Sequence, residues 1–169
     1  VYKRQVLIEM LQLVKDEIPD IHLIIAGEGP AKQSYIKLAN KLGLDENISF
    51  VGYLDRATEL VDCYHSADLF VFSSKTETQG LVLLEAMAAG TPVVSVAEMG
   101  TRDVLRGCQA AKITNGEPRD FADKVISVLK NHETLNLLKS EAKPYAATWD
   151  STALAKKMLE FYQMVIDSK

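Results

Sequence analysis

The sequence predicts an α/β fold in which a parallel sheet carries helices on both faces. Short runs of apolar, often β-branched residues alternate with amphipathic helical segments along the 169 residues, and this order produces parallel strands joined by right-handed crossovers. The runs contain few polar residues, as in strands that are buried on both faces. Glycine and proline stand at the junctions, where they end helices and form turns.

The first half of the chain contains a leading helix and two strand–helix units. The expected elements are a helix over residues 6–18, a strand over 22–26, a helix over 31–42, a strand over 48–51 and a helix that starts after Asp55. Apolar residues recur at helical spacing in the leading segment, and Pro19 ends it. Pro30 suits the first position of the second helix, and Gly43 suits the position after its end. Asp55 is a residue type that caps helix N-termini.

The second half continues the alternation and then becomes helical. The expected elements are a strand over 69–73, a helix over 81–89, a strand over 92–96, a short helix with Val104 and Leu105, a strand over 110–114, and helices over 118–130, 133–142 and 151–167. The segment 81–89 is apolar on nearly every side, so its helix should be buried. Gly90 is placed to end this helix.

The composition excludes some classes of protein. The chain carries 19 Lys and Arg against 23 Asp and Glu, a net charge of −4, which disfavours nucleic acids and anionic membrane surfaces as partners. No apolar run reaches the roughly 18–20 residues that span a bilayer. Cys63 and Cys108 stand outside any C-x-x-C pattern, and no histidine pair has metal-ligand spacing. We therefore expect no metal site, reduced cysteines and a cytoplasmic location.

Three loops are candidates for a binding site, because ligands of open parallel sheets bind at the carboxyl ends of the strands. They are residues 27–30, 52–55 and 74–80. The first loop, GEGP, lacks the third glycine of a dinucleotide fingerprint because Lys32 stands there, which disfavours NAD. Two compatible interpretations remain for this loop: a tight strand-to-helix turn, or a turn that leaves room beside a nucleotide.

Two glutamates mark the third loop and the helix behind it. Glu77 lies in the loop, and Glu85 lies inside the apolar helix. A buried carboxylate needs partners, so Glu85 either reaches the surface, pairs with a lysine or arginine, or meets ligand hydroxyls. Gly80 allows a close approach of the backbone. The N–H groups of Gly80, Leu81 and Val82 should point out of the helix start, where the helix dipole favours an anion.

The two glutamates have seven residues between them, and this spacing resembles the E-x7-E element of retaining GT-B glycosyltransferases that use nucleotide-sugar donors. Further segments fall in the order of that family: IIAGEGP (24–30), ISFVGYL (48–54), YHSADLFVFSS (64–74), GLVLLEAMAAGTPVV (80–94) and a terminal helix with Tyr162. The chain is similar to the C-terminal, donor-binding domain of the group 1, or family 4-like, members. The resemblance implies one Rossmann-like, nucleotide-sugar-binding domain over residues 1–169.

The resemblance also implies roles for individual residues. Glu77 would be the catalytic residue that contacts hydroxyls of the donor sugar, and Glu85 would accept hydrogen bonds from the ribose. The other donor-binding positions are the amides of Gly80, Leu81 and Val82 on the diphosphate, with Gln79 beside them, Gly27 and Gly29 along the diphosphate approach, Gly52, Tyr53 and Leu54 around the nucleobase, and Lys3 as a cation that balances the diphosphate. Gln79 stands where many members have Phe, and this variant resembles members that glycosylate lipids.

The implied activity is transfer of a hexose, with retention of configuration, from a UDP- or GDP-linked sugar to an acceptor such as a lipid or polysaccharide precursor of the cell envelope. The nucleotide sugar is the expected partner, and no metal or other cofactor is expected. Two alternatives stay open: the donor domain of a nucleotide-sugar epimerase, and a nucleotide-binding domain without catalysis. Saturable binding of a nucleoside diphosphate would distinguish a functional donor site from a domain that shares only the fold.

The start of the chain departs from the family pattern. The family's domain opens with a strand that ends in a Gly-Arg pair, whereas VYKRQ leads here directly into the first helix. We therefore expect a fragment: a sheet that lacks its first, central strand, no N-terminal acceptor domain, and no transfer by this chain alone. The full-length enzyme would be cytoplasmic, with peripheral contact to the inner face of the membrane.

Overall fold

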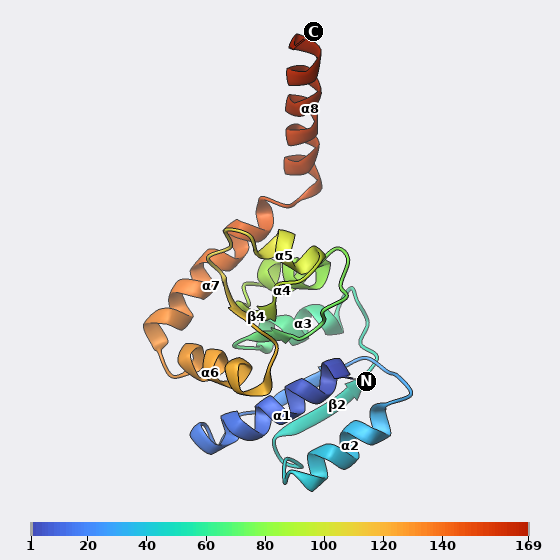
Figure 1. Ribbon diagram of the computed structural model, residues 1–169, viewed down its shortest axis with the longest axis vertical. Helices are drawn as coiled ribbons and strands as arrows, with labels where there is room; N and C mark the ends of the chain where they lie inside the picture. The colour runs from blue at the N-terminus through green and yellow to red at the C-terminus, as the bar shows by residue number, and fades with distance from the viewer. Residues whose placement is uncertain (1, 169) are drawn as a thin grey trace.

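The computed structural model describes residues 2–168 and shows strands alternating with helices (Figure 1). The helices are α1 (Tyr2–Glu17), α2 (Lys32–Lys41), α3 (Glu59–Ser66), α4 (Leu81–Ala89), α5 (Gly100–Leu105), α6 (Pro118–Leu129), α7 (His132–Ala147) and α8 (Ser151–Asp167). The strands are β1 (Leu23–Ala26), β2 (Ile48–Gly52), β3 (Phe70–Phe72), β4 (Val93–Val96) and β5 (Ala111–Thr114). Each predicted element is present, so the predicted α/β class is confirmed.

The strands form two parallel sheets instead of one. β1 pairs with β2 in one sheet, and β3, β4 and β5 pair in that order in the other. Among the described residues β1 and β3 do not pair with each other, and both line an open cavity of about 1460 Å³ that α1 also lines. The break between β1 and β3 confirms the expectation of a sheet without its central strand.

Helices cover both faces of the three-stranded sheet. In β4, Val93 packs in a cluster with α4, α5 and α7, whereas Val94 packs with α1 and α6. Successive residues of a strand point to opposite faces, so both faces of β4 are apolar and covered. α1 also holds the two-stranded sheet, because Ile8 and Leu11 pack with Ile25 of β1. The central strand β4 is therefore buried on both faces, as its apolar sequence indicated, whereas β3 is half-buried and β5 is partly exposed.

Two predicted helix starts are wrong. α2 begins two residues after Pro30, because a turn from Gly29 comes first. α3 begins only at Glu59, and Asp55 caps the preceding turn instead: its Oδ1 accepts a hydrogen bond from the N–H of Thr58 at 3.1 Å. Aspartate side chains bond nearby backbone N–H groups in turns as readily as at helix starts, so the residue type alone does not distinguish the two.

Two helices are longer than predicted. α1 starts before residue 6 because Lys, Arg and Gln are good helix formers, and Gln5 donates to Glu9 one turn later at 2.8 Å. α7 runs past its predicted end at residue 142. It does so because Tyr145 packs against the core beside α4, and its hydroxyl donates to the carbonyl of Val104. Tertiary contacts thus extend α7 beyond its local sequence signals.

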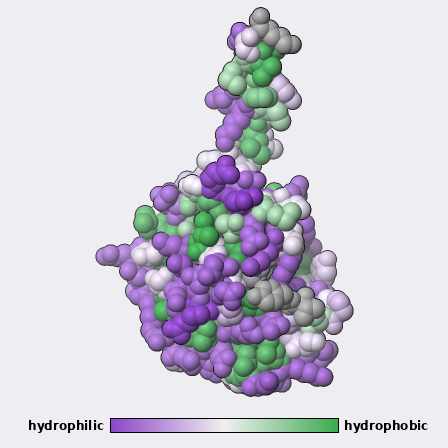
Figure 2. Space-filling model, viewed as in Figure 1, coloured by the Kyte–Doolittle hydropathy of each residue, from purple (hydrophilic) through white to green (hydrophobic). Residues whose placement is uncertain are grey.

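The last helix, α8, projects from the body of the molecule (Figure 1). Asp150 caps its N-terminus by accepting from the N–H of Ala153 at 2.7 Å. None of its residues is buried, and large apolar side chains such as Leu159, Tyr162 and Ile166 are exposed. Figure 2 shows these hydrophobic residues interspersed with polar ones along the projecting helix. α8 therefore contributes nothing to the core that positions the strand ends.

Candidate functional site

The carboxyl ends of β1 and β3 meet at the N-terminus of α1. Arg4 of α1 donates to the carbonyls of Ala26 and Gly27 at 3.1 and 3.3 Å, which lie at the end of β1. The main-chain carbonyl of Lys3 accepts from the Ser73 hydroxyl at the end of β3, and the Lys3 ammonium donates to the hydroxyl of Thr76 at 2.7 Å. α1 thus gathers the loops after β1 and β3 at one edge of the fold.

Arg4 is a residue that the sequence reasoning missed. A charged residue near a chain start is most often solvated, but the Arg4 side chain is half-buried against the end of β1. The signal that points to it is its place beside Lys3, which the resemblance had already singled out. Together the two side chains bring two positive charges to the strand ends.

Loop 74–80 folds around the carboxylate of Glu77. Glu77 Oε1 accepts hydrogen bonds from the N–H groups of Gln79 and Gly80, both at 3.2 Å. Gly80 is the N-cap of α4 with φ of +72°, a left-handed conformation that glycine adopts without strain. The loop therefore turns sharply into α4, and the Glu77 carboxylate is hydrogen-bonded to the backbone of its own loop.

This geometry changes the predicted anion cradle. Gly80 was expected to offer its N–H to a diphosphate together with Leu81 and Val82, but here that N–H donates to Glu77. The first helical bond of α4 runs from the N–H of Leu83 to the carbonyl of Gly80 at 3.0 Å. The N–H groups of Leu81 and Val82 precede it at the positive end of the helix dipole. Of the three predicted cradle positions, only the amides of Leu81 and Val82 therefore remain candidates for contact with an anion.

The start of α5 supports loop 74–80 from behind. The N–H of Gly100 donates to the carbonyl of Glu77 at 2.9 Å. A Cβ atom at Gly100 would lie only 2.2 Å from the carbonyl oxygen of Thr78, so no other residue fits there without moving the backbone. Gly80 is also closely packed, since its Cβ would lie 3.0 Å from Val104 Cγ2. The loop is therefore fixed by direct backbone packing.

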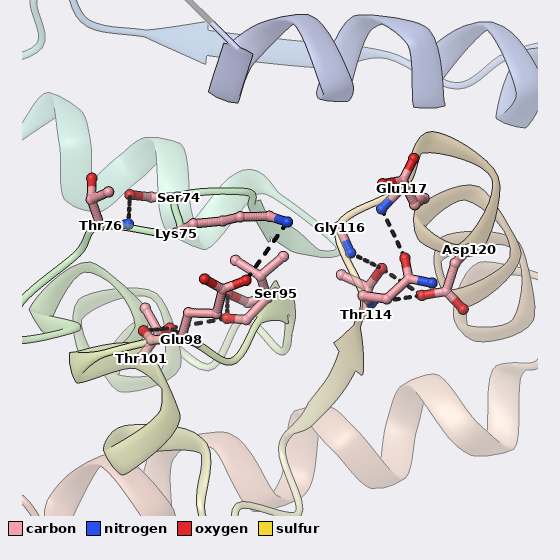
Figure 3. A network of polar contacts seen from close by, with 12 residues as sticks. Ser74, Lys75, Thr76, Ser95, Glu98, Thr101, Thr114, Gly116, Glu117 and Asp120 are labelled. Atoms are coloured by element: carbon pink, nitrogen blue, oxygen red, sulfur yellow. Dashed lines mark hydrogen bonds and ion pairs between the residues drawn. The ribbon is translucent and has the colours of Figure 1, made fainter.

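A network of polar contacts continues along the ends of β4 and β5 (Figure 3). The hydroxyl of Thr101 donates to the carbonyls of Val96 and Glu98 at 3.0 and 2.7 Å. The Lys75 ammonium lies 3.6 Å from the Glu98 carboxylate, which links loop 74–80 to the loop after β4. Thr114 at the end of β5 donates to Asp120 of α6 at 2.6 Å (Figure 3). These contacts stabilise the strand ends through side-chain hydrogen bonds rather than apolar packing.

The carboxylate of Glu85 is held by an arginine. Glu85 lies in the second turn of α4, and its side chain is 32% exposed. Its Oε1 is 2.6 Å from Nη2 of Arg56, and its Oε2 is 3.4 Å from the hydroxyl of Tyr64. Burial raises the pKa of Tyr64 to about 12, and the nearby Glu85 charge adds to this shift, so the hydroxyl keeps its proton. Of the possibilities left open, the structure shows the pairing with arginine.

Arg56 is the second residue that the sequence reasoning missed. It directly follows the loop 52–55, which the rule on strand ends had selected. Two features of the sequence could have pointed to Arg56: it is a cation directly after a strand-end loop, and the apolar helix 81–89 contains a glutamate that needs a partner. No single segment carries both members, since Arg56 and Glu85 are 29 positions apart.

Two cavities lie side by side at this edge. Glu77 lines the large cavity between β1 and β3, and Glu85 lines a smaller one of about 350 Å³ between α3 and α4. Arg56 and Tyr64 line both cavities, so they stand at the boundary. The two glutamates therefore occupy neighbouring hollows, with Arg56 between them.

The remaining predicted residues divide into two groups. The large cavity is lined by Lys3, Gly27, Tyr53 and Leu54 together with Glu77. Tyr53 is 82% exposed, so its ring is open to a ligand. The other predicted positions do not line this cavity: Gly29 and the side chain of Gln79 are exposed, and Gly52 is buried and accepts from the N–H of Gly27. The fold thus brings together residues from three separate loops.

The described residues contain no group of three or more His, Cys, Asp or Glu side chains that could hold a metal ion. Cys63 and Cys108 are both free thiols, and burial raises the pKa of each. Within residues 2–168 no helix combines the length and the apolar character needed to cross a membrane.

Comparisons with known proteins place the chain in a family. Residues 3–144 match the family described as Glycosyl transferases group 1. Over 162 residues the chain is 31% identical to the putative glycosyltransferase EpsD of Bacillus subtilis (strain 168), a match that covers 95% of this chain and 42% of EpsD. The chain thus spans less than half the length of this curated relative.

Solved structures give the same fold. The chain is similar to a mutant of S. aureus TarM in complex with Fondaparinux, alpha-GlcNAc-glycerol and UDP, with a TM-score of 0.81, 27% identity and coverage of 92% of this chain and 32% of TarM. It also matches the C-terminal domain of LpcC from Francisella tularensis, a glycosyl transferase group 1 family protein, with a TM-score of 0.78 and 22% identity over 86% of this chain and 78% of that domain. The chain therefore belongs to the glycosyl transferase group 1 family, and its fold is that of the C-terminal, Rossmann-like half of a GT-B glycosyltransferase.

Proposed function

We propose that this chain is the donor-binding half of a retaining glycosyltransferase and that it binds a UDP- or GDP-linked hexose at the edge described above. The observation that carries the proposal is the placing of Glu77 and Glu85 on either side of the start of α4, one in the loop and one in the second turn. Family membership and the UDP bound in the TarM structure support it.

Residues at the carboxyl ends of the strands can be assigned to each part of a nucleotide sugar. The N–H groups of Leu81 and Val82, with the ammonium of Lys3, would meet the diphosphate through charge-assisted hydrogen bonds. Glu85 would accept from the ribose hydroxyls, and Glu77 from the hydroxyls of the hexose. The exposed ring of Tyr53 lies beside Leu54 at the same cavity, where a nucleobase can stack.

The chemistry that fits this arrangement is displacement on the face of the sugar that the leaving group occupies. The bond between the anomeric carbon and the diphosphate oxygen breaks, and the acceptor oxygen bonds the same face. The acceptor proton passes to the leaving diphosphate. The contribution of this chain is electrostatic: fixed amides and a lysine stabilise the charge that develops on the diphosphate. No metal is part of the proposal.

Several finer points belong to the proposal alone. The acceptor is a lipid or polysaccharide precursor, and it is bound mainly by an acceptor domain that the residues described here do not include. The two free cysteines favour a reducing, cytoplasmic location. By itself the chain is expected to bind the donor without transferring the sugar.

Calorimetric titration of the full chain with UDP, GDP and their hexose derivatives tests the proposal. Saturable binding of one nucleoside diphosphate is expected. Glu85→Ala should weaken the binding of that nucleotide by about 1–3 kcal/mol, the cost of losing a polar interaction at a desolvated site. Glu77→Ala should leave free nucleotide binding unchanged and weaken only the sugar nucleotide. Binding of neither nucleotide, or equal losses for both ligands in Glu77→Ala, would contradict these assignments.

A further inference from the structure

Arg56 is held near Glu85 by the backbone and not by its own side chain. The turn before α3 is fixed by Asp55, whose Oδ1 accepts from the backbone N–H groups of Ala57 and Thr58 at 3.0 and 3.1 Å. The N–H of Asp55 in turn donates to Glu59 at 2.8 Å. The side chain of Arg56, by contrast, is 76% exposed, and it pairs with Glu85. Hydrogen bonds therefore fix the backbone that carries Arg56, whereas its exposed guanidinium contacts the carboxylate of Glu85.

Among residues 2–168, the polar contacts of the Glu85 carboxylate come from the side of α3. Arg56 and Tyr64 reach its two oxygens from the turn before α3 and from α3 itself. Glu85 consequently lines the small cavity between α3 and α4, whereas Glu77 lines the large one. A ligand that lies along the start of α4 must reach Glu85 from the other side of this ion pair.

We propose that Arg56 acts as a latch on the nucleotide site: in the nucleotide-free chain it holds the Glu85 carboxylate toward the groove between α3 and α4, and the ribose hydroxyls of the incoming nucleotide displace it. The inference rests on the proposed function, since it takes Glu85 as the ribose acceptor. It assigns Arg56 a regulatory role that opposes binding, rather than a role as a ligand of the nucleotide.

The expected effect is small and has a definite sign. A carboxylate that already accepts from a guanidinium at 2.6 Å is a weaker acceptor for hydroxyl groups, and breaking the pair subtracts from the binding free energy. Exposed ion pairs contribute between about 0 and 1 kcal/mol. The latch therefore lowers nucleotide affinity by a factor of up to about five. Salt screens exposed pairs, so the effect should shrink as the ionic strength rises.

Isothermal titration of the full chain with UDP and with 2′-deoxy-UDP, or with the guanosine pair if GDP binds more tightly, tests this inference. Arg56→Ala should bind the ribonucleotide about two- to five-fold more tightly than the wild type at low salt, with a smaller gain for the deoxynucleotide. The gain should fall toward unity at about 1 M salt, where the Debye length is only about 3 Å. Arg56→Lys, which keeps the charge, should lie between the two.

A double-mutant cycle shows whether Arg56 acts through Glu85. In the Glu85→Gln background, Arg56→Ala should give no further gain, because the carboxylate that the latch holds is gone. Arg106→Ala is the matched control: Arg106 is equally exposed and pairs with Asp103 at 3.6 Å, so its loss should change neither affinity.

The outcomes separate this inference from the proposed function. If the wild type binds UDP or GDP and Glu85→Gln weakens that binding, the site stands. Weaker binding in Arg56→Ala would then make Arg56 a ligand of the nucleotide and overturn the latch, as would an unchanged affinity at low salt. A gain that persists in the Glu85→Gln background would equally overturn it. A wild type that binds neither nucleotide would overturn the proposed function, and the latch with it.

Discussion

The two-stranded sheet of β1 and β2 and the three-stranded sheet of β3 to β5 both send loops to the same edge, but they hold those loops differently. All four residues of β4 are buried, whereas Ile24 of β1 is 44% exposed. Loop 74–80 is fixed by backbone packing against Gly100. In the two-stranded half, Tyr53 and Arg56 extend into solvent.

This difference suggests that the two halves of the proposed site bind different parts of the donor. The three-stranded half presents the loop and helix start that would meet the sugar and the diphosphate, and these groups are held by a closed core. The two-stranded half presents the side chains that would meet the nucleobase, and few contacts restrain them. Groups that stabilise developing charge need fixed positions, whereas a surface that only adds affinity tolerates mobility.

Core truncation should expose the difference most strongly. Leu83 of α4 is fully buried in the cluster that packs on β4, and Leu83→Ala should lower the free energy of unfolding by about 2–5 kcal/mol through lost burial and a cavity. Ile24→Ala, on the exposed side of β1, should cost under about 1 kcal/mol. Urea unfolding followed by circular dichroism measures both. Similar losses in the two variants would show that the halves are equally well packed.

Glycine replacements sharpen the comparison at the loops. Gly100→Ala places a methyl group 2.2 Å from the carbonyl oxygen of Thr78, so the loop backbone must move. We expect a loss of about 1–3 kcal/mol, as in overpacked cores, and weaker sugar-nucleotide binding. Gly29→Ala in the two-stranded half is the control, because no heavy atom lies within 4 Å of the position that its methyl group would take. Differential scanning fluorimetry should show a shift for the first variant alone; equal shifts would contradict the packing argument.

The smallest effect is expected from pH. The hydroxyl of Thr114 and the N–H of Asn115 hold the pKa of Asp120 below its ordinary value of 3.8. A lowered pKa in the folded state stabilises the protein above the unfolded pKa, and this contribution is lost as the pH falls through the folded pKa. The stability difference between wild type and Asp120→Asn should be constant above about pH 5 and shrink below about pH 4.

A second variant checks the cause of that pH dependence. Thr114→Val removes the hydroxyl that makes the largest contribution to the Asp120 shift. Urea unfolding at several pH values should show a weaker loss of stability on the acid side for this variant than for the wild type. If the free energy of unfolding of both variants fell with acid as it does in the wild type, the hydrogen bonds of Asp120 with Thr114 and Asn115 would not stabilise the three-stranded half.

Local sequence signals determined most of the secondary structure. The apolar runs predicted all five described strands, although only β4 is buried along its whole length. Gly80 and Gly90 marked both ends of α4. The signals failed at Pro30 and Asp55, which suit turns and helix starts equally well. They also failed at the end of α7, where the packing of Tyr145 outweighs local propensity.

The amino-acid sequence by itself determined the α/β class, the order of the elements and the two glutamates at the start of α4, because each of these follows from periodicity or from residues close together in the chain. The break in the sheet was expected from the resemblance to the family, whose domain opens with a strand before the first helix. Only the tertiary structure decided how the carboxylates are used. Glu77 binds amides of its own loop, whereas Glu85 pairs with Arg56 of a distant segment and Arg4 reaches the end of β1. Ion pairs and hydrogen bonds between segments far apart in the chain depend on where the backbone places each side chain, and no local pattern encodes that distance.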